Sequence, residues 1–387
     1  MNFPKWRKYF TNNVLLALMI CLIQTQAVGQ NKSVDRGASR KWTDQHAKIV
    51  DKVVAEQIKQ QNLVGVAVGM IVDGEVVYTK GYGKSDLENG TAVSTKTVFN
   101  YASNSKPVVA MLAMQLSEQG KLDLDADIRK YLPEFPERKY KVTTRDLLCH
   151  QSGYPHYSNG TIVPISNRKL SVEDRQNPEL SMLPFGKSPL LFEPGQKFSY
   201  SSYAYVVLSA VIQRAGNQPI AKQLDDRIVK PLKLTSFQLD LPFKNQANWT
   251  NAYQRKRDGG HTLVRDYAHY WKHGAGGYKS NIVDFSNWAK ALMLSDLIKE
   301  ETRAKMWTPQ KFTNGKVSGF GLGVGCSGSG DNFSVSHGGS QNETKTTMRI
   351  YPKRKAGIVV MCNTQGADVA QIELAIRRAL KGKLNTR

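Results

Sequence analysis

Ser103 and Lys106 are the two residues of this chain whose types and spacing most clearly suggest chemistry. They lie three positions apart at the head of an apolar run that extends to Leu116. If this run is helical, the two side chains share a face, so the lysine amine can reach the serine hydroxyl. A buried lysine can lose its proton and act as a base toward such a hydroxyl. Because Pro107 lacks a backbone N–H and is tolerated only near a helix start, we expect the helix to begin within residues 103–105.

Two later groups of residues follow this pair along the chain. Tyr200-Ser-Ser202 stands just before an apolar helix predicted over residues 206–214, and His337-Gly-Gly339 ends a strand predicted over residues 333–337. In order and rough spacing, the three groups resemble the motifs of the serine β-lactamase and penicillin-binding protein superfamily, and most of all its class C β-lactamase-related branch. The resemblance covers roughly residues 43–385.

The resemblance implies a role for each group. Ser103 would attack a carbonyl carbon to form an acyl-enzyme, and neutral Lys106 would take the proton. Tyr200, with its pKa lowered by nearby cations, would exchange protons with the leaving group. By analogy with the family, backbone N–H groups of Ser103 and Ser340 would form an oxyanion hole. The residues expected to contact the substrate are Ser202, Gly338, Gly339 and Ser340.

Two positions depart from the better-known form of these motifs. Ser202 stands where the family has asparagine, and a hydroxyl is shorter than an amide. His337 stands where the family has lysine. An imidazole is largely neutral near pH 7, so His337 could donate one hydrogen bond but would attract a carboxylate weakly. We therefore place His337 in the catalytic group and expect neutral esters or amides to be preferred to carboxylate-bearing β-lactams.

Other candidate motifs lack the context that their chemistry requires. Ser166 and Lys169 repeat the spacing of the first pair, but in a polar loop with no apolar helix behind them. Residues 323–328 match G-x-G-x-x-G, yet a strand follows them where phosphate binding needs a helix. The sequence contains no G-x-S-x-G, which argues against an α/β-hydrolase nucleophile turn.

The histidines and cysteines do not have the spacing of a metal site. We interpret His150 as a structural residue of its turn and the other histidines as surface residues, while leaving open that His156 or His273 lines the cleft. Those other histidines are His46, His156, His261, His269 and His273. Beyond residue 29 the cysteines are Cys149, Cys326 and Cys362, an odd number without C-x-x-C spacing. We expect no disulfide framework, no zinc site and no cofactor.

The predicted elements indicate a mixed α/β (α+β) architecture. A helix should start at Thr43 or Asp44, Asp73-Gly74 should turn a hairpin, and Asp368 should cap a last helix. The expected strands span residues 63–72, 75–82, 333–337, 346–351 and 358–361. This order suggests an antiparallel sheet flanked by N- and C-terminal helices with an inserted, largely helical domain, as in β-lactamases and transpeptidases. The expected domains are an α/β domain of residues 41–102 and 276–387 and a helical domain with active-site loops of residues 103–275.

The first 29 residues have the composition of a secretory signal peptide. A basic segment precedes an apolar stretch, residues 14–23, that is too short to span a bilayer, and small residues follow at 27–29. Residues 30–40 should be a linker. Removing residues 1–29 takes away three basic residues and no acidic ones, so the formal charge would fall from +22 to +19. Such a surface attracts polyanions, which outside the cytoplasm are cell-wall polymers or anionic lipid, or it serves solubility alone.

We therefore expect a periplasmic or secreted serine hydrolase with no transmembrane segment after signal cleavage. It would act through a Ser103 acyl-enzyme on an amide, an ester, a cell-wall peptide or a β-lactam. The partner is then a small-molecule or peptide substrate, for which peptidoglycan is one candidate source, and not a nucleic acid. The alternative is a non-hydrolytic penicillin-binding or structural member of the same fold. The sequence does not distinguish among these substrates and does not give the oligomeric state.

Overall fold

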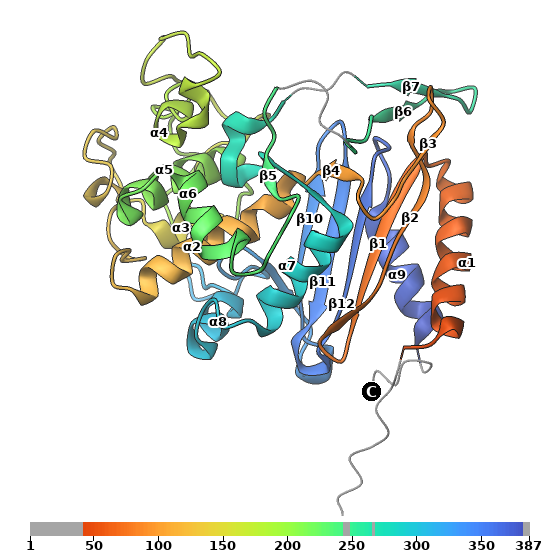
Figure 1. Ribbon diagram of the computed structural model, residues 1–387. Helices are drawn as coiled ribbons and strands as arrows, with labels where there is room; N and C mark the ends of the chain where they lie inside the picture. The colour runs from red at the N-terminus through yellow and green to blue at the C-terminus, as the bar shows by residue number, and fades with distance from the viewer. Residues whose placement is uncertain (1–41, 243–247, 265–267, 382–387) are drawn as a thin grey trace, which may run out of the picture. The chain divides into compact units, whose positions relative to one another are not determined.

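A seven-stranded antiparallel sheet lies at the centre of the fold (Figure 1). The computed structural model describes residues 42–242, 248–264 and 268–381. The strand order is β3-β2-β1-β12-β11-β10-β9, so β1 (Gly65–Val72) pairs with both β2 (Glu75–Asp86) and the late strand β12 (Ala356–Cys362). The predicted sheet, built from both ends of the chain, is confirmed.

The remaining strands complete this sheet and form two smaller ones. The other strands of the large sheet are β3 (Thr91–Ala92), β9 (Gly325–Ser327), β10 (Ser334–Ser340) and β11 (Lys345–Tyr351). A three-stranded sheet has the order β4 (Val98–Asn100), β8 (Tyr278–Asn281) and β5 (Gln238–Leu239). β6 (Tyr253–Arg255) and β7 (His261–Leu263) form a separate two-stranded hairpin.

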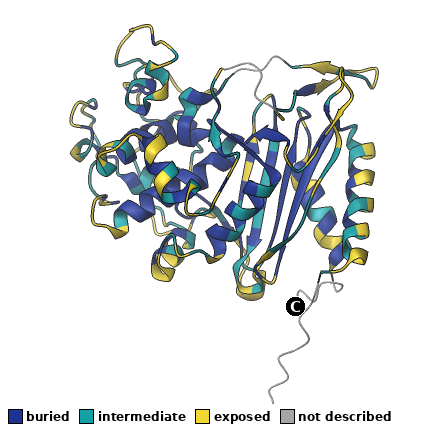
Figure 2. Ribbon diagram, viewed as in Figure 1, coloured by how far each residue is buried: buried dark blue, intermediate teal, exposed yellow. Residues whose placement is uncertain are grey.

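Helices cover both faces of the large sheet. α1 (Asp44–Gln61) and α9 (Val369–Leu380) pack on one face, where Val50 and Ile372 join a cluster with Val66. α7 (Ile282–Leu294) lies on the other face, where Phe285 belongs to a cluster that contains Ala67. Every residue of β1 is therefore buried, as Figure 2 shows for the central strands. A continuous apolar strand is what two covered faces require.

A group of helices lies beyond α7, on the side of the sheet opposite α1 and α9 (Figure 1). Its members are α2 (Ser105–Glu118), α3 (Thr144–Leu148), α4 (Pro178–Ser181), α5 (Ser202–Gly216), α6 (Ile220–Leu224) and α8 (Glu300–Trp307). α2 is buried from Ser105 to Leu116, which confirms the predicted buried helix. α5 packs against it and is buried from Ala204 to Ile212.

Local sequence features set several element ends where the sequence predicts them. Thr43 is the N-cap of α1, and the Asp368 carboxylate accepts the Gln371 N–H at the start of α9. Asp73 and Gly74 turn the β1–β2 hairpin with φ angles of 51° and 83°. Positive φ at both positions is the geometry of the type I′ hairpin turn.

The long segment from residue 154 to 195 is mostly irregular. Within it lie a 3₁₀ turn, η3 (Asp174–Gln176), and the single-turn helix α4. The proposed signal peptide and linker fall outside the described residues. The described residues belong to one compact unit, and the division into two domains at residues 103 and 275 stays a prediction. Over the described ranges, no helix is long and apolar enough to cross a membrane.

Candidate active site

Ser103 lies in a short 3₁₀ turn, η1 (Ala102–Asn104), directly before α2. The helix begins at Ser105, within the predicted range. Ala102 has a φ of 47°, and its N–H donates to the Asn100 side-chain oxygen over 2.8 Å. The residues on either side of Ser103 are buried, whereas Ser103 itself remains partly exposed. The turn thus presents the Ser103 hydroxyl at the end of a buried helix.

Two contacts hold the Ser103 turn against the sheet. The Asn104 amide donates to the Thr346 hydroxyl of β11 over 2.8 Å, and that hydroxyl donates to the Tyr101 carbonyl over 3.1 Å. β10 also lies close to the Ser103 turn. A Cβ atom at Gly339 would lie 2.1 Å from the Thr346 hydroxyl oxygen and 3.0 Å from the Tyr101 carbonyl oxygen. Only glycine fits at position 339, so Gly339 sets the distance between β10 and the Ser103 turn.

Lys106 is fully buried and contacts three oxygen atoms. Its Nζ lies 3.1 Å from the Ser103 hydroxyl, 3.3 Å from the Ser202 hydroxyl and 2.6 Å from the Ala275 carbonyl. Burial holds the pKa of Lys106 well below its usual value, and the positive charge of Lys272 lowers it further. The amine is therefore suited to the neutral state that a base requires.

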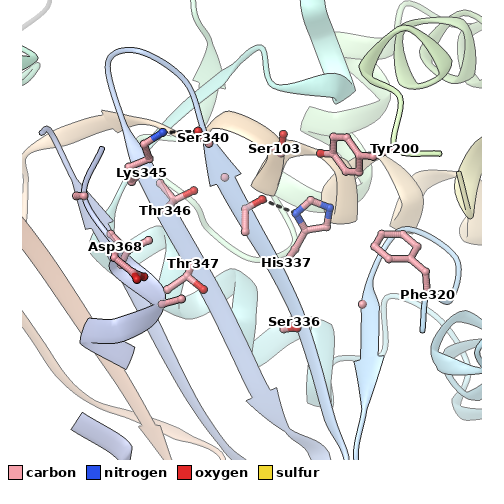
Figure 3. Close-up of a pocket in the computed structure, with 16 residues that line it drawn as sticks. Ser103, Tyr200, Phe320, Ser336, His337, Ser340, Lys345, Thr346, Thr347 and Asp368 are labelled. Carbon is pink, nitrogen blue, oxygen red and sulfur yellow. Dashed lines mark hydrogen bonds between the residues drawn. The ribbon is translucent and has the colours of Figure 1, made fainter. Parts of the chain in front are cut away.

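Tyr200 stands beside Ser103, with its hydroxyl directed toward the serine (Figure 3). Burial raises the pKa of Tyr200 above its usual value, although the hydrogen bond with Ser103 acts in the opposite direction. The predicted lowering of this pKa by cations is therefore wrong. The Lys106 nitrogen lies 4.8 Å from the centre of the Tyr200 ring, over its face, and a neutral amine there supplies no charge to stabilise a phenolate.

Two histidines fix the backbone that carries Tyr200. The Ser201 N–H donates to Nδ1 of His150 over 3.2 Å, and the Ser202 N–H donates to Nδ1 of His156 over 3.1 Å. His150 has a φ of 58° and is fully buried, which confirms it as a structural residue of its turn. His156 is half-buried, packs edge-on against the Tyr200 ring at 5.6 Å, and so belongs to the wall of the site.

His337 is buried on β10, and its ring points toward Tyr200 and Phe320 (Figure 3). Its Nδ1 lies 2.7 Å from the Gly338 carbonyl, which can only accept, so Nδ1 carries the proton. Nε2 then has a free lone pair, and no described group bonds to it. Burial lowers the pKa of His337 to about 3. The ring is therefore neutral, as predicted, but it offers the site an acceptor instead of the predicted donor.

The predicted substrate contacts gather around one cavity. Gly338, Gly339 and Ser340 line it together with Ser103, Tyr200 and His337. Ser202 instead lies behind the nucleophile, against Lys106. The oxyanion role of the Ser103 and Ser340 N–H groups stays a prediction.

Sequence reasoning missed several residues that complete the site. The Ala275 carbonyl holds Lys106, Thr346 anchors the nucleophile turn, and Lys345 lines the cavity. Nothing in the sequence around Ala275 predicts the role of a backbone carbonyl. A lone lysine or threonine in a strand has no sequence pattern that would indicate such a role.

Two histidines expected at the surface are buried. His269 pairs with Glu343 over 2.9 Å, and Nε2 of His273 lies 3.1 Å from the Arg175 carbonyl. Burial lowers the pKa of His273 to about 4. Because both side chains are enclosed by the segments around the site, their surface assignment is wrong. Where the structure describes the chain, no cluster of three or more potential metal ligands occurs.

Comparisons with known proteins show to which family the chain is similar. The beta-lactamase family model matches residues 50–383. "Serine beta-lactamase-like protein LACTB, mitochondrial" of Mus musculus is 28% identical, over 63% of this chain and 59% of that protein. "Esterase EstB" of Burkholderia gladioli is 31% identical, over 47% of this chain and 49% of that protein.

A solved structure shows the same fold along nearly its whole length. The D-amino acid amidase from Ochrobactrum anthropi SV3 superposes with a TM-score of 0.72 at 19% identity, covering 87% of this chain and 99% of the amidase. The chain spans 59% of the length of the LACTB proteins of mouse and human.

Proposed function

Because this chain belongs to the beta-lactamase family, we propose that it is a serine hydrolase that works through an acyl-enzyme at Ser103. The observation that carries the proposal is the 3.1 Å distance from the fully buried Lys106 amine to the Ser103 hydroxyl. A lysine in that position is a base because burial disfavours its charged form.

The contacts of Lys106 assign its two protons and its lone pair. The Ala275 carbonyl can only accept, so one N–H of the neutral amine donates to it. The second N–H donates to the Ser202 hydroxyl, which leaves the lone pair for the Ser103 hydroxyl proton. Ser202 thus fulfils, with a hydroxyl, the acceptor role that an amide oxygen would have.

Acylation then follows from these assignments. Lys106 takes the Ser103 proton as the serine oxygen bonds to the substrate carbonyl carbon. When the bond to the leaving group breaks, protonated Tyr200 donates its proton to that group and regains one from Lys106. The raised pKa of Tyr200 keeps it protonated at neutral pH. In deacylation, a water molecule gives a proton to the same relay while its oxygen bonds to the acyl carbon. The bond between that carbon and the Ser103 oxygen then breaks, the acid product leaves, and the relay returns the proton to Ser103.

The substrates we propose are esters and amides. The named relatives include an esterase and an amidase, and both bond types react through the same tetrahedral intermediate. Cell-wall peptides and β-lactams are amides and remain within this class.

The composition of residues 1–29 supports a periplasmic or secreted location.

Intact-mass spectrometry tests the acyl-enzyme. The protein is incubated with p-nitrophenyl acetate, a D-Ala-D-Ala peptide or a penicillin, and its mass and the released product are followed. We expect a transient acyl adduct and continuing product release with at least one substrate. Ser103→Ala should show neither. Ser166→Ala, which removes the other serine with a lysine three positions later, should behave as the unmodified protein.

Two results would contradict this proposal. An adduct mapped to Ser166 would mean that the wrong serine has been assigned. A stable adduct at Ser103 without product release, for every substrate, would favour the non-hydrolytic alternative.

A further inference from the structure

The Asp240 carboxylate takes no part in the proposed mechanism, yet it is fully buried close to the nucleophile turn. Asp240 directly follows β5, and the three-stranded sheet brings it together with Asn100 at the end of β4 and Lys279 of β8. Its Oδ1 lies 2.9 Å from the Lys279 amine. Replacing a buried ion pair by apolar side chains often costs no stability, so stability alone does not explain why this pair is there.

One set of contacts leads from Asp240 to the nucleophile turn. The Asn100 amide donates to Oδ2 of Asp240 over 2.8 Å. The Asn100 oxygen therefore faces the other way, and it accepts the Ala102 N–H over 2.8 Å. Because a carboxylate can only accept, Asp240 fixes which end of the Asn100 amide meets Ala102.

Ala102 needs this support because of its backbone conformation. Its φ of 47° lies in the left-handed region, which is unfavourable for a residue with a Cβ atom. Ser103 follows directly, so a different conformation of Ala102 would change where the Ser103 hydroxyl and N–H point. The hydrogen bond from Ala102 to Asn100 thus helps to aim the nucleophile.

A second set of contacts leads from Asp240 to the segment that holds the base. Its Oδ2 also accepts the His269 N–H over 2.9 Å, and its backbone carbonyl accepts the Tyr270 N–H over 3.1 Å. These contacts lie at the start of η5 (Tyr270–Ala275), whose last residue holds the Lys106 amine through its carbonyl, at 2.6 Å. Asp240 therefore contacts the segments that place both the nucleophile and its base.

We propose that Asn100 and Asp240 are positioning residues for the acyl-enzyme reaction, and that they do so by holding Ala102 in its left-handed conformation. The inference rests on the proposed function and adds two residues that act through the nucleophile turn without touching the substrate. The support should become dispensable if residue 102 adopts this conformation without help. Glycine does so readily, because it has no Cβ atom.

Rescue by glycine tests the role of Asn100. Asn100→Ala removes the acceptor of the Ala102 N–H, so kcat/KM for p-nitrophenyl acetate, which reports acylation, should fall by roughly tenfold or more. In proteins that already carry Ala102→Gly, the same change should cost no more than about threefold. Asn217→Gly is the matched control, since Asn217 has a φ of 49° at the C-cap of α5. It removes a similar backbone cost elsewhere and should not restore activity to Asn100→Ala.

An exchange of the two side chains tests the role of Asp240. Asn100→Asp sets two carboxylates against each other, and we expect it to lower kcat/KM by roughly tenfold or more. Adding Asp240→Asn places a donor against an acceptor again and keeps the total charge. It should recover about threefold or more of the loss, although the His269 N–H then loses its acceptor. Circular dichroism gives the folded fraction of every variant, and Asn100→Ser replaces Asn100→Ala if the latter does not fold.

Failure of this inference differs from failure of the proposed function. If esters are hydrolysed through Ser103 but Asn100→Ala leaves kcat/KM unchanged, the positioning role is wrong and the acyl-enzyme stands. A loss that Ala102→Gly does not reduce, or that Asn217→Gly reduces equally, would mean that Asn100 serves stability alone. Absence of any recovery in the exchanged protein would remove Asp240 from the proposal. If Ser103 of the unmodified protein is not acylated, both proposals fail.

Discussion

Lys106 and Tyr200 depart from their usual pKa values in opposite directions, and both do so because they are buried. A buried amine prefers its neutral form and a buried phenol keeps its proton. Over a wide pH range, Lys106 is therefore a neutral base and Tyr200 a protonated acid, which are the two states that acylation needs. Charged neighbours are not required for this, since desolvation is the largest cause for each group.

The protonation states of Lys106 and Tyr200 predict how kcat/KM depends on pH. The catalytic form has neutral Lys106 and protonated Tyr200, so kcat/KM for a neutral ester should rise as pH rises through the lowered pKa of Lys106. It should then stay level to about pH 10, because the pKa of Tyr200 lies above its usual value. Initial rates, corrected for spontaneous hydrolysis, measure the profile. A fall between pH 7 and 9 would mean that Tyr200 ionises there and that the proton relay is misassigned.

At the scale of elements, the turn of residues 150–156 holds the start of α5 in place. His150 and His156 accept successive backbone N–H groups from this start, and the Ser201 hydroxyl donates to the Pro155 carbonyl over 2.7 Å. Burial, with help from the charge of Lys272, lowers the pKa of His156 to about 4, so its Nδ1 remains an acceptor at neutral pH. His156 is thus a positioning residue for Ser202 and Tyr200.

Isosteric replacements test that role. The side-chain oxygen of asparagine can take the place of Nδ1, whereas that of glutamine reaches the place of Nε2. We expect His156→Asn to keep kcat within about threefold, and His156→Gln and His156→Ala to lower kcat roughly tenfold with little change in KM, since an unpaired buried N–H costs about 1–3 kcal/mol. The control is His261→Asn, in the β6–β7 hairpin away from the site. Equal losses in the asparagine and glutamine variants would show that bulk, and not the accepted hydrogen bond, matters.

The same elements show what the sequence could and could not predict. The start of α2 and the caps of α1 and α9 follow from residues within a few positions, because capping and proline effects are local. The raised pKa of Tyr200 and the burial of His269 and His273 depend on segments distant in sequence, which pack around them. The place of Lys345 could not be predicted from the sequence either, since only the β10–β11 register places it beside Ser340.

At the scale of the whole molecule, the two ends of the described chain close one face of the sheet. The apolar stripe of α9 is buried, with Ile372 and Ile376 fully enclosed against strands from both ends. The site lies across the sheet from this cluster, and β10 and β11 connect the two. A loss of packing under α9 should therefore lower the stability of the site as well as that of the terminal helices.

Ile376→Ala tests this connection. Removing a fully buried isoleucine side chain typically costs about 2–5 kcal/mol, so the free energy of unfolding and the Tm should both fall. The Arg378→Ala control, on the exposed side of α9, should change stability by less than about 0.5 kcal/mol. Because the described residues form one compact unit, loss of ester hydrolysis and loss of helical circular dichroism should coincide along a urea titration in both variants. If activity instead survives beyond the helical transition, the terminal helices unfold separately, and the sheet holds the site without them.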